Sequence, residues 1–266
     1  MTDPRKPFSF IEISGKRSVQ KPRTNGLTLI SDWGLGLSET RELLETTGEY
    51  LDIAKIATGT ARLYKEDLLM EKLSLYSSFD VRPYLGGQFM EYVYAHKGPA
   101  VLERFLEEAY RLGFRASEVS ENYVRLDPDE RVRQIRMMRE VGIDAFAEVG
   151  SKKENSDPRE LVEQALRDMD AGAEMVLVEG AEIVLSGSVN HRMVDVLSAS
   201  LDIGRTMFEL PTTRIGSTLP EIHHVKKTLI RMVGPDVNIA NLSPGEIMET
   251  ESLRVGLGVV GPDVQS

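Results

Sequence analysis

Eight short β-type runs recur along the chain at intervals of roughly thirty residues, the length of one strand-plus-helix unit. Each run is too short for a helix. The runs are Leu27–Ser31, Leu51–Ala57, Val81–Leu85, Arg115–Ser120, Ala145–Val149, Met175–Glu179, Thr206–Leu210 and Val237–Leu242. Alternating strands and helices require a parallel sheet, and eight units predict an α/β chain closed into a (β/α)8 TIM barrel. An open doubly wound sheet is the alternative.

Amphipathic segments separate these runs and predict the helices. They cover Ser38–Thr47, Tyr64–Ser77, Pro128–Val141, Pro158–Ala171, Met193–Leu201, Pro220–Val233 and Pro244–Leu257. The third connection, residues 88–112, is predicted as two helices broken at Gly98-Pro99. Helix starts are predicted at Ser38, Asp127, Asp157 and Ser243, and helix ends at Gly113, Gly142 and Gly172.

The chain has 266 residues, of which 41% are hydrophobic, and this is enough for one large domain. We expect an N-terminal extension over residues 1–25, which covers the barrel floor or a neighbouring subunit. The barrel is expected over residues 26–258, followed by a C-terminal tail over residues 259–266. The N-terminus lacks the apolar stretch of a signal peptide and no run has the length of a transmembrane helix, which predicts a cytoplasmic protein.

The charge and the absence of cysteine exclude several functional classes. Acidic residues outnumber basic ones by 42 to 32, giving a net charge of −10, so nucleic acid and anionic membranes are not expected partners. The acidic surface is compatible with a soluble homo-oligomer. Without cysteine there are no disulfides or thiolate sites, so a bound metal is expected to be a hard cation held by carboxylates.

Barrel enzymes take their catalytic groups from the ends of the strands and the loops that follow. Every predicted strand ends in polar or ionisable residues. They are Asp32, Lys55, Tyr84 with Gly86 and Gly87, Glu118 with Ser120, Glu148 with Lys152, Glu179 with Glu182, Glu209, and Asn238 with Asn241. Polarity commonly begins at strand ends, so each residue taken alone also has a structural explanation, whereas the whole set favours an active site.

The four glutamates at the ends of strands four to seven should converge on one small space. Unpaired carboxylates repel each other there, so we expect a divalent cation or a lysine among them, and Mg²⁺ fits such a site. Lys55 interrupts the apolar run LDIAKIA, and its alternation with Ile53 and Ala57 predicts that it points inward. Lys152 follows the fifth strand in EVGSKK, where position alone does not separate it from Lys153.

Weaker candidates surround this set. The Gly86-Gly87 pair could offer backbone amides to a phosphate, although a tight turn also requires glycine. Arg214 and Arg254 are candidate anion contacts, and His223-His224 are interpreted as helix residues rather than metal ligands.

Taken together, the strand-end strings resemble phosphosulfolactate synthase, the first enzyme of a coenzyme M pathway. The resemblance runs from about Leu27 to Gly256 and rests on LDIAKIATGTARLY, RPYLGGQFMEY, EVSENY, AEVGSKK, DMDAGAEMVLVEG, FELP, VNIAN and ESLRVGL. It implies an oligomeric (β/α)8 barrel that uses Mg²⁺ to add sulfite to C3 of phosphoenolpyruvate, giving (2R)-phosphosulfolactate. Such an enzyme is a carbon–sulfur lyase that works in the synthase direction.

The resemblance also implies roles for individual residues. Lys152 would be the general acid, Lys55 a contact to the substrate anion or intermediate, and Glu118 a further catalytic residue. The implied metal site consists of Glu148, Glu179 and Glu209. The implied substrate-binding residues are Asp32, Tyr84, Gly86, Gly87, Ser120, Arg214 and Asn241.

Three loops depart from the family pattern by losing a basic residue. Trp33, Ala181 and Gly258 stand where relatives carry lysine or arginine. Arg62, Arg125 and Arg214 are the nearby residues that could replace the lost contacts. The alternatives are an enzyme with the same mechanism and a different nucleophile or acceptor, or a non-catalytic protein like the plant heat-stress-associated relatives.

Overall fold

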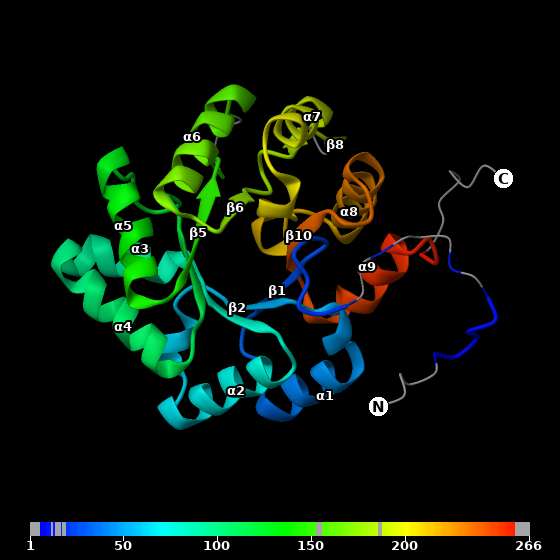
Figure 1. The fold of residues 1–266 in the computed structure, drawn as a ribbon, viewed down its shortest axis with the longest axis horizontal. Helices are drawn as coiled ribbons and strands as arrows, with labels where there is room; N and C mark the ends of the chain where they lie inside the picture. The colour runs from blue at the N-terminus through cyan, green and yellow to red at the C-terminus, as the bar shows by residue number, and fades with distance from the viewer. Residues whose placement is uncertain are drawn as a thin grey trace.

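The computed structural model describes residues 6–11, 13, 17, 20–152, 156–185 and 188–258, and its centre is a closed barrel of parallel strands (Figure 1). The order around the barrel is β1-β10-β9-β6-β5-β4-β3-β2, with helices packed outside. The strands are β1 (Thr28–Asp32), β2 (Ile53–Ile56), β3 (Arg82–Leu85), β4 (Ala116–Val119), β5 (Asp144–Val149), β6 (Met175–Val178), β9 (Thr206–Glu209) and β10 (Asn238–Leu242). This confirms the (β/α)8 prediction, with every strand boundary within two residues of its predicted place.

The outer layer follows the predicted order of helices. They are α1 (Leu37–Thr47), α2 (Glu66–Ser78), α3 (Gly87–Lys97), α4 (Leu102–Leu112), α5 (Pro128–Val141), α6 (Pro158–Ala171), α7 (His191–Ser200), α8 (Leu219–Val233) and α9 (Ile247–Arg254). The predicted break at Gly98-Pro99 is confirmed, because α3 ends at Lys97 and a 3-10 turn over Pro99–Val101 precedes α4. A short hairpin of β7 (Val184–Leu185) and β8 (Ser188–Val189) follows β6.

Most predicted helix ends are confirmed, with two corrections. Asp127 and Asp157 accept hydrogen bonds from the first turns of α5 and α6. The helix predicted from Ser38 begins one residue earlier, at Leu37, and its cap is Gly36 rather than Ser38; the Glu39 carboxylate accepts the Gly36 backbone N–H at 2.7 Å. The last predicted helix was too long, because a 3-10 turn follows Ser243 and α9 ends at Arg254.

Inside the barrel, alternate residues of each strand point to the centre. Along several strands, one inward-pointing residue is apolar and the next inward-pointing residue is charged. Ten apolar residues fill the lower interior, among them Ile53, Ala116, Phe146, Leu177 and Met207. In each of these five strands, the residue two places further on is charged. Because strand side chains alternate with a period of two, these charged residues form the next layer up, at the C-terminal rim.

The segment before β1 contacts the opposite, N-terminal end of the barrel. Arg17 Nε lies 3.0 Å from Oε2 of Glu251, and Arg23 Nε lies 3.0 Å from Oδ1 of Asp52, which precedes β2. The predicted tail over residues 259–266 lies outside the described residues, so the domain boundaries stay a prediction. No helix in the described part of the chain is long and apolar enough to cross a membrane.

Candidate active site

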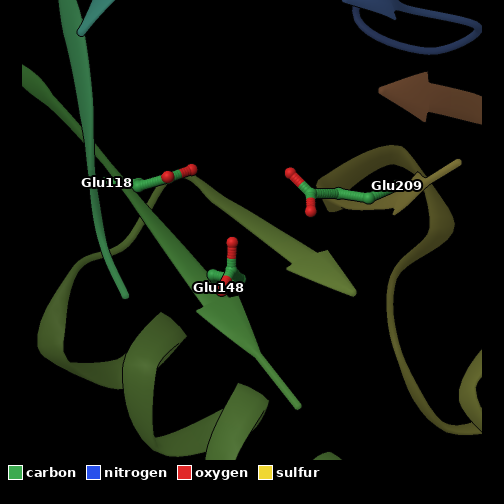
Figure 2. A group of neighbouring side chains, drawn as sticks. All are labelled: Glu118, Glu148 and Glu209. Atoms are coloured by element: carbon green, nitrogen blue, oxygen red, sulfur yellow. The ribbon is translucent and has the colours of Figure 1, made fainter. Parts of the chain in front are cut away.

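Three buried carboxylates meet at the C-terminal rim. Glu118, Glu148 and Glu209 come from β4, β5 and β9, and each offers an oxygen within 4.8 Å of the other two. Figure 2 shows their carboxyl groups directed toward a shared space. Five per cent or less of each residue is exposed, so solvent does little to weaken their mutual repulsion.

Lys55, from β2, lies between two of these carboxylates. Its Nζ lies 3.3 Å from Oε2 of Glu118 and 3.4 Å from Oε1 of Glu209. Burial alone would lower the pKa of Lys55, but the surrounding glutamates raise it above its ordinary value, so the side chain is an ammonium at neutral pH. These contacts show that Lys55 points into the barrel, as its position in the strand predicts.

The carboxylates differ in their ability to hold a charge. Burial raises the pKa of Glu118, but Lys55 and hydrogen bonds from Tyr84 and the Gly87 N–H outweigh it, and the net pKa is lowered. Burial and the neighbouring carboxylates raise the pKa of Glu148 well above its usual range. Burial raises the pKa of Glu209 to about 7, even with Lys55 beside it.

This donor set fits a hard divalent cation. With Glu179 included, four buried carboxylates share this space with three cationic groups, Lys55, Lys152 and Arg214, so full ionisation leaves one negative charge without compensation. Oε2 of Glu179 is buried and accepts no hydrogen bond. Carboxylate oxygens are the ligands that Mg²⁺ and Ca²⁺ prefer, and among the described residues Glu118, Glu148 and Glu209 form a group compact enough to hold such an ion. The metal site implied by the resemblance consists of Glu148, Glu179 and Glu209, whereas the group in the structure contains Glu118 instead of Glu179.

Lys152 reaches the same space from the loop after β5. Its Nζ lies 3.6 Å from Oε2 of Glu179, and 34% of its side chain is exposed. Although burial lowers the pKa of Lys152, Glu148, Glu179 and Glu209 raise it above its ordinary value. Lys153, the alternative that the sequence left open, lies outside the described residues.

The loop that carries Lys152 is held by Glu182, which the sequence had grouped with Glu179. Glu182 is fully buried, and its carboxylate accepts the backbone N–H groups of Ser151 and Ser156, both at 2.8 Å. Gly150 has φ +106°, and a Cβ there would lie 2.5 Å from Cγ of Glu182, so only glycine fits. Glu182 therefore positions the lysine loop.

Asn122 contacts the carboxylate group and was not among the predicted site residues. Asn122 Nδ2 donates to Oε1 of Glu148 at 2.7 Å, and Arg131 Nη2 donates to the Glu148 carbonyl at 2.7 Å. Asn122 follows β4 by three residues, and its place in a post-strand loop and in the EVSENY string were the available signals.

The space enclosed by these residues is a cavity of about 150 Å³, and we call it the catalytic cavity. Its lining includes ten of the thirteen predicted site residues, namely Lys55, Gly86, Gly87, Glu118, Glu148, Lys152, Glu179, Glu209, Arg214 and Asn241. The Gly87 amide is already used, because it donates to Oε1 of Glu118 at 2.9 Å. A Cβ at Gly86 would lie 2.9 Å from the Thr58 nitrogen, so close packing explains that glycine.

The other three predicted residues are not among those that line this cavity. Asp32 is buried, lies 2.5 Å from Lys72 Nζ, and accepts the backbone N–H groups of Gly34 and Leu35. Ser120 donates to Glu91 at 2.5 Å. Tyr84 lies in the apolar layer below and donates its hydroxyl hydrogen to Glu118. All three hold neighbouring parts of the site in place.

The three arginines considered as replacements lie in different surroundings. Arg214 lines the catalytic cavity. Arg125 has a side chain that is 75% exposed, 3.8 Å from Glu121, and Arg62 lines a groove beside α2, α3 and α4. Arg214 also stacks on the indole ring of Trp33, one of the three positions where the resemblance implies a lost basic residue.

The fold and this ring of charges define the class: a single-domain (β/α)8 barrel with its candidate active site at the C-terminal rim. A family model described as (2R)-phospho-3-sulfolactate synthase (ComA) matches residues 16–259. The chain is 34% identical over 248 residues to the phosphosulfolactate synthase of Methanothermobacter thermautotrophicus, covering 89% of this chain and 91% of that protein. The chain belongs to the phosphosulfolactate synthase family.

Two more distant similarities complete the comparison. The chain is 22% identical to the Arabidopsis thaliana protein HEAT-STRESS-ASSOCIATED 32, over 88% of this chain and 87% of that protein. Among solved structures, 3-hexulose-6-phosphate synthase from Salmonella typhimurium aligns with a TM-score of 0.55 at 13% identity, over 87% of this chain and 99% of that one. At that identity the structural likeness supports the fold alone.

Proposed function

We propose that this protein is a phosphosulfolactate synthase that adds sulfite to C3 of phosphoenolpyruvate with the help of Mg²⁺. The observation that carries the proposal is the ring of four buried glutamates and two lysines in a family member. The chemistry of addition to an enolpyruvate needs both a means to stabilise negative charge and a proton donor, and this ring offers both.

In the proposed reaction, the lone pair of sulfite sulfur forms a bond to C3 of phosphoenolpyruvate. The electrons of the C2–C3 double bond move toward the carboxylate, and C2 then takes a proton to give phosphosulfolactate. Lys152 is the proposed donor, because its raised pKa keeps it protonated and it is partly exposed, so it can regain a proton from water. Lys55 holds positive charge beside the developing enediolate.

Glu118, Glu148 and Glu209 would hold the metal ion. A bound Mg²⁺ supplies positive charge that stabilises an enediolate. The protein's own part is to hold these carboxylates close together: Asn122 donates to Glu148, and Tyr84 donates to Glu118, the carboxylate whose pKa is lowered.

The test is incubation of purified protein with phosphoenolpyruvate, sulfite and Mg²⁺, with and without EDTA, followed by mass analysis. We expect phosphosulfolactate that depends on both sulfite and Mg²⁺. Lys97→Ala, at an exposed lysine on α3, is a control that should keep full activity. If phosphoenolpyruvate is untouched while the folded protein binds Mg²⁺, the synthase proposal fails, and other nucleophiles become the substrates to screen.

A further inference from the structure

The Arg214 guanidinium lies over the face of the Trp33 indole, with its Cζ 4.1 Å from the ring centroid. Both side chains are exposed. In the part of the chain that the structure describes, no carboxylate or carbonyl pairs with Arg214. A stacked guanidinium keeps its planar array of N–H donors free at its edge, so this arrangement presents an oriented cation without a counter-ion.

The pair stands where two cavities join. Trp33 and Arg214 line the catalytic cavity, and they also line a larger one of about 620 Å³ over the loops that follow β1, β9 and β10. Ser31, Thr212 and Asn241 are the other residues common to both. A ligand that extends from the catalytic cavity toward this larger space passes the residues that line both, the stacked pair among them.

Asn241 adds a second donor at the same junction. Its backbone has φ +63°, an uncommon conformation for a residue other than glycine, at the end of β10. Oδ1 of Asn241 accepts the Ser31 hydroxyl at 3.2 Å, which leaves the Nδ2 hydrogens as the free end of the amide. No acceptor among the described residues takes them.

We propose that Arg214 and Asn241 form the subsite for the phosphate group of the substrate, and that Trp33 positions Arg214 for this contact. This inference rests on the proposed function, because it assigns one end of a phosphorylated three-carbon acid. Lys55 and Lys152, the other cations of the catalytic cavity, already face carboxylates. A phosphate dianion needs a cation of its own, and loops after the seventh and eighth barrel strands commonly bind phosphate.

The chain offers a direct probe, because Trp33 is its only tryptophan. Intrinsic fluorescence therefore reports on the ring that supports Arg214. We would titrate inorganic phosphate, and separately phosphoenolpyruvate without sulfite, into the wild-type protein and the variants Arg214→Gln, Arg214→Lys and Arg125→Gln. Calorimetry on the same samples gives Kd independently of the fluorescence.

We expect a saturable fluorescence change in the wild type and in Arg125→Gln. Arg214→Gln should lose that change and bind phosphoenolpyruvate about ten- to hundredfold more weakly, as expected for a charge-assisted contact. Arg214→Lys should fall between them, because it keeps the charge and loses the planar fork. Trp33→Leu should raise KM with little change in kcat, whereas Trp33→Phe should restore most of the affinity.

The outcomes separate this inference from the synthase proposal. If phosphate binds through Arg214 but no product forms with sulfite, the subsite stands and the synthase assignment fails. If product forms and Arg214→Gln leaves both KM and the Kd for phosphoenolpyruvate unchanged, the synthase assignment stands and the subsite is wrong. Circular dichroism of each variant shows that the fold is intact, which the exposure of Arg214 leads us to expect.

Discussion

Lys152 Nζ lies 3.6 Å from Oε2 of Glu179, a buried carboxylate oxygen that accepts no hydrogen bond. That separation is too long for a hydrogen bond, so the carboxylate attracts the ammonium without fixing it. Glu182 holds the loop beneath the lysine through two backbone N–H groups. The result is a protonated amine that stays at the rim and is free to turn toward a ligand, which is what a general acid requires.

Replacement of Lys152 by alanine should therefore remove the proton donor and leave ligand binding largely intact. We expect kcat to fall by about 10²- to 10⁴-fold, the usual contribution of general acid catalysis, with the Kd for phosphoenolpyruvate changed only a few-fold. Steady-state kinetics and calorimetry check the two quantities, with Lys97→Ala as the matched control. Unchanged turnover in Lys152→Ala would remove this residue from the mechanism.

Metal binding can be tested without any turnover. Glu148→Gln keeps the size of the side chain and removes one of the three carboxylates that lie within 4.8 Å of each other. We expect its Mg²⁺ affinity to fall by about tenfold or more, because Mg²⁺ depends on charged oxygen ligands. Calorimetric titration with MgCl₂ measures this, and Glu163→Gln, at an exposed residue of α6, is the control. Equal affinities for both variants would place the metal elsewhere.

The raised carboxyl pKa values predict how metal affinity varies with pH. Burial raises the pKa of Glu209 to about 7 in the metal-free protein, and the pKa of Glu148 is raised as well. Mg²⁺ must displace these protons, so its affinity should fall as the pH drops from about 8 to about 6. Titrations in two buffers of different ionisation enthalpy should detect proton release on binding, greater at pH 6 than at pH 8.

The same shift has a consequence for stability. Because the folded-state pKa of Glu209 lies above the unfolded value, the unfolded chain holds fewer protons between these two values. The free energy of unfolding of the metal-free protein should therefore decrease as the pH rises from about 5 to 7. Added Mg²⁺ should reverse the trend, and an EDTA-treated sample in urea at several pH values provides the check.

Much of the fold and the charged ring could be predicted because both depend on local patterns. The repeated runs define the strands, and a period of two places Lys55, Glu118, Glu148 and Glu209 on the inner face of a closed barrel. The sequence pattern does not specify the register between neighbouring strands. Tyr84 pairs with Ala116 rather than with Glu118, so its ring lies one layer below the carboxylates.

The sequence predicts less well the surroundings of residues whose partners lie far along the chain. Asp32 ends a strand like the catalytic candidates, but Lys72 of α2, forty residues later, takes its charge. Asn122 reaches Glu148 only because of the course of the loop after β4, which has no periodic signal. Contacts of this kind come from tertiary packing, and a single sequence carries no pattern for them.

A substitution at Asp32 also tests whether this residue binds substrate or stabilises the fold. It is fully buried, lies 2.5 Å from the equally buried Lys72, and accepts the Tyr76 hydroxyl at 2.9 Å. Asp32→Asn keeps the shape but leaves Lys72 as an uncompensated buried charge, so we expect a loss of about 3–5 kcal/mol in the free energy of unfolding. Urea denaturation followed by circular dichroism measures it. Glu108→Gln, which removes the exposed ion pair with Arg111, should leave the midpoint unchanged. A fully stable Asp32→Asn protein with weakened phosphoenolpyruvate binding would instead make Asp32 a substrate contact.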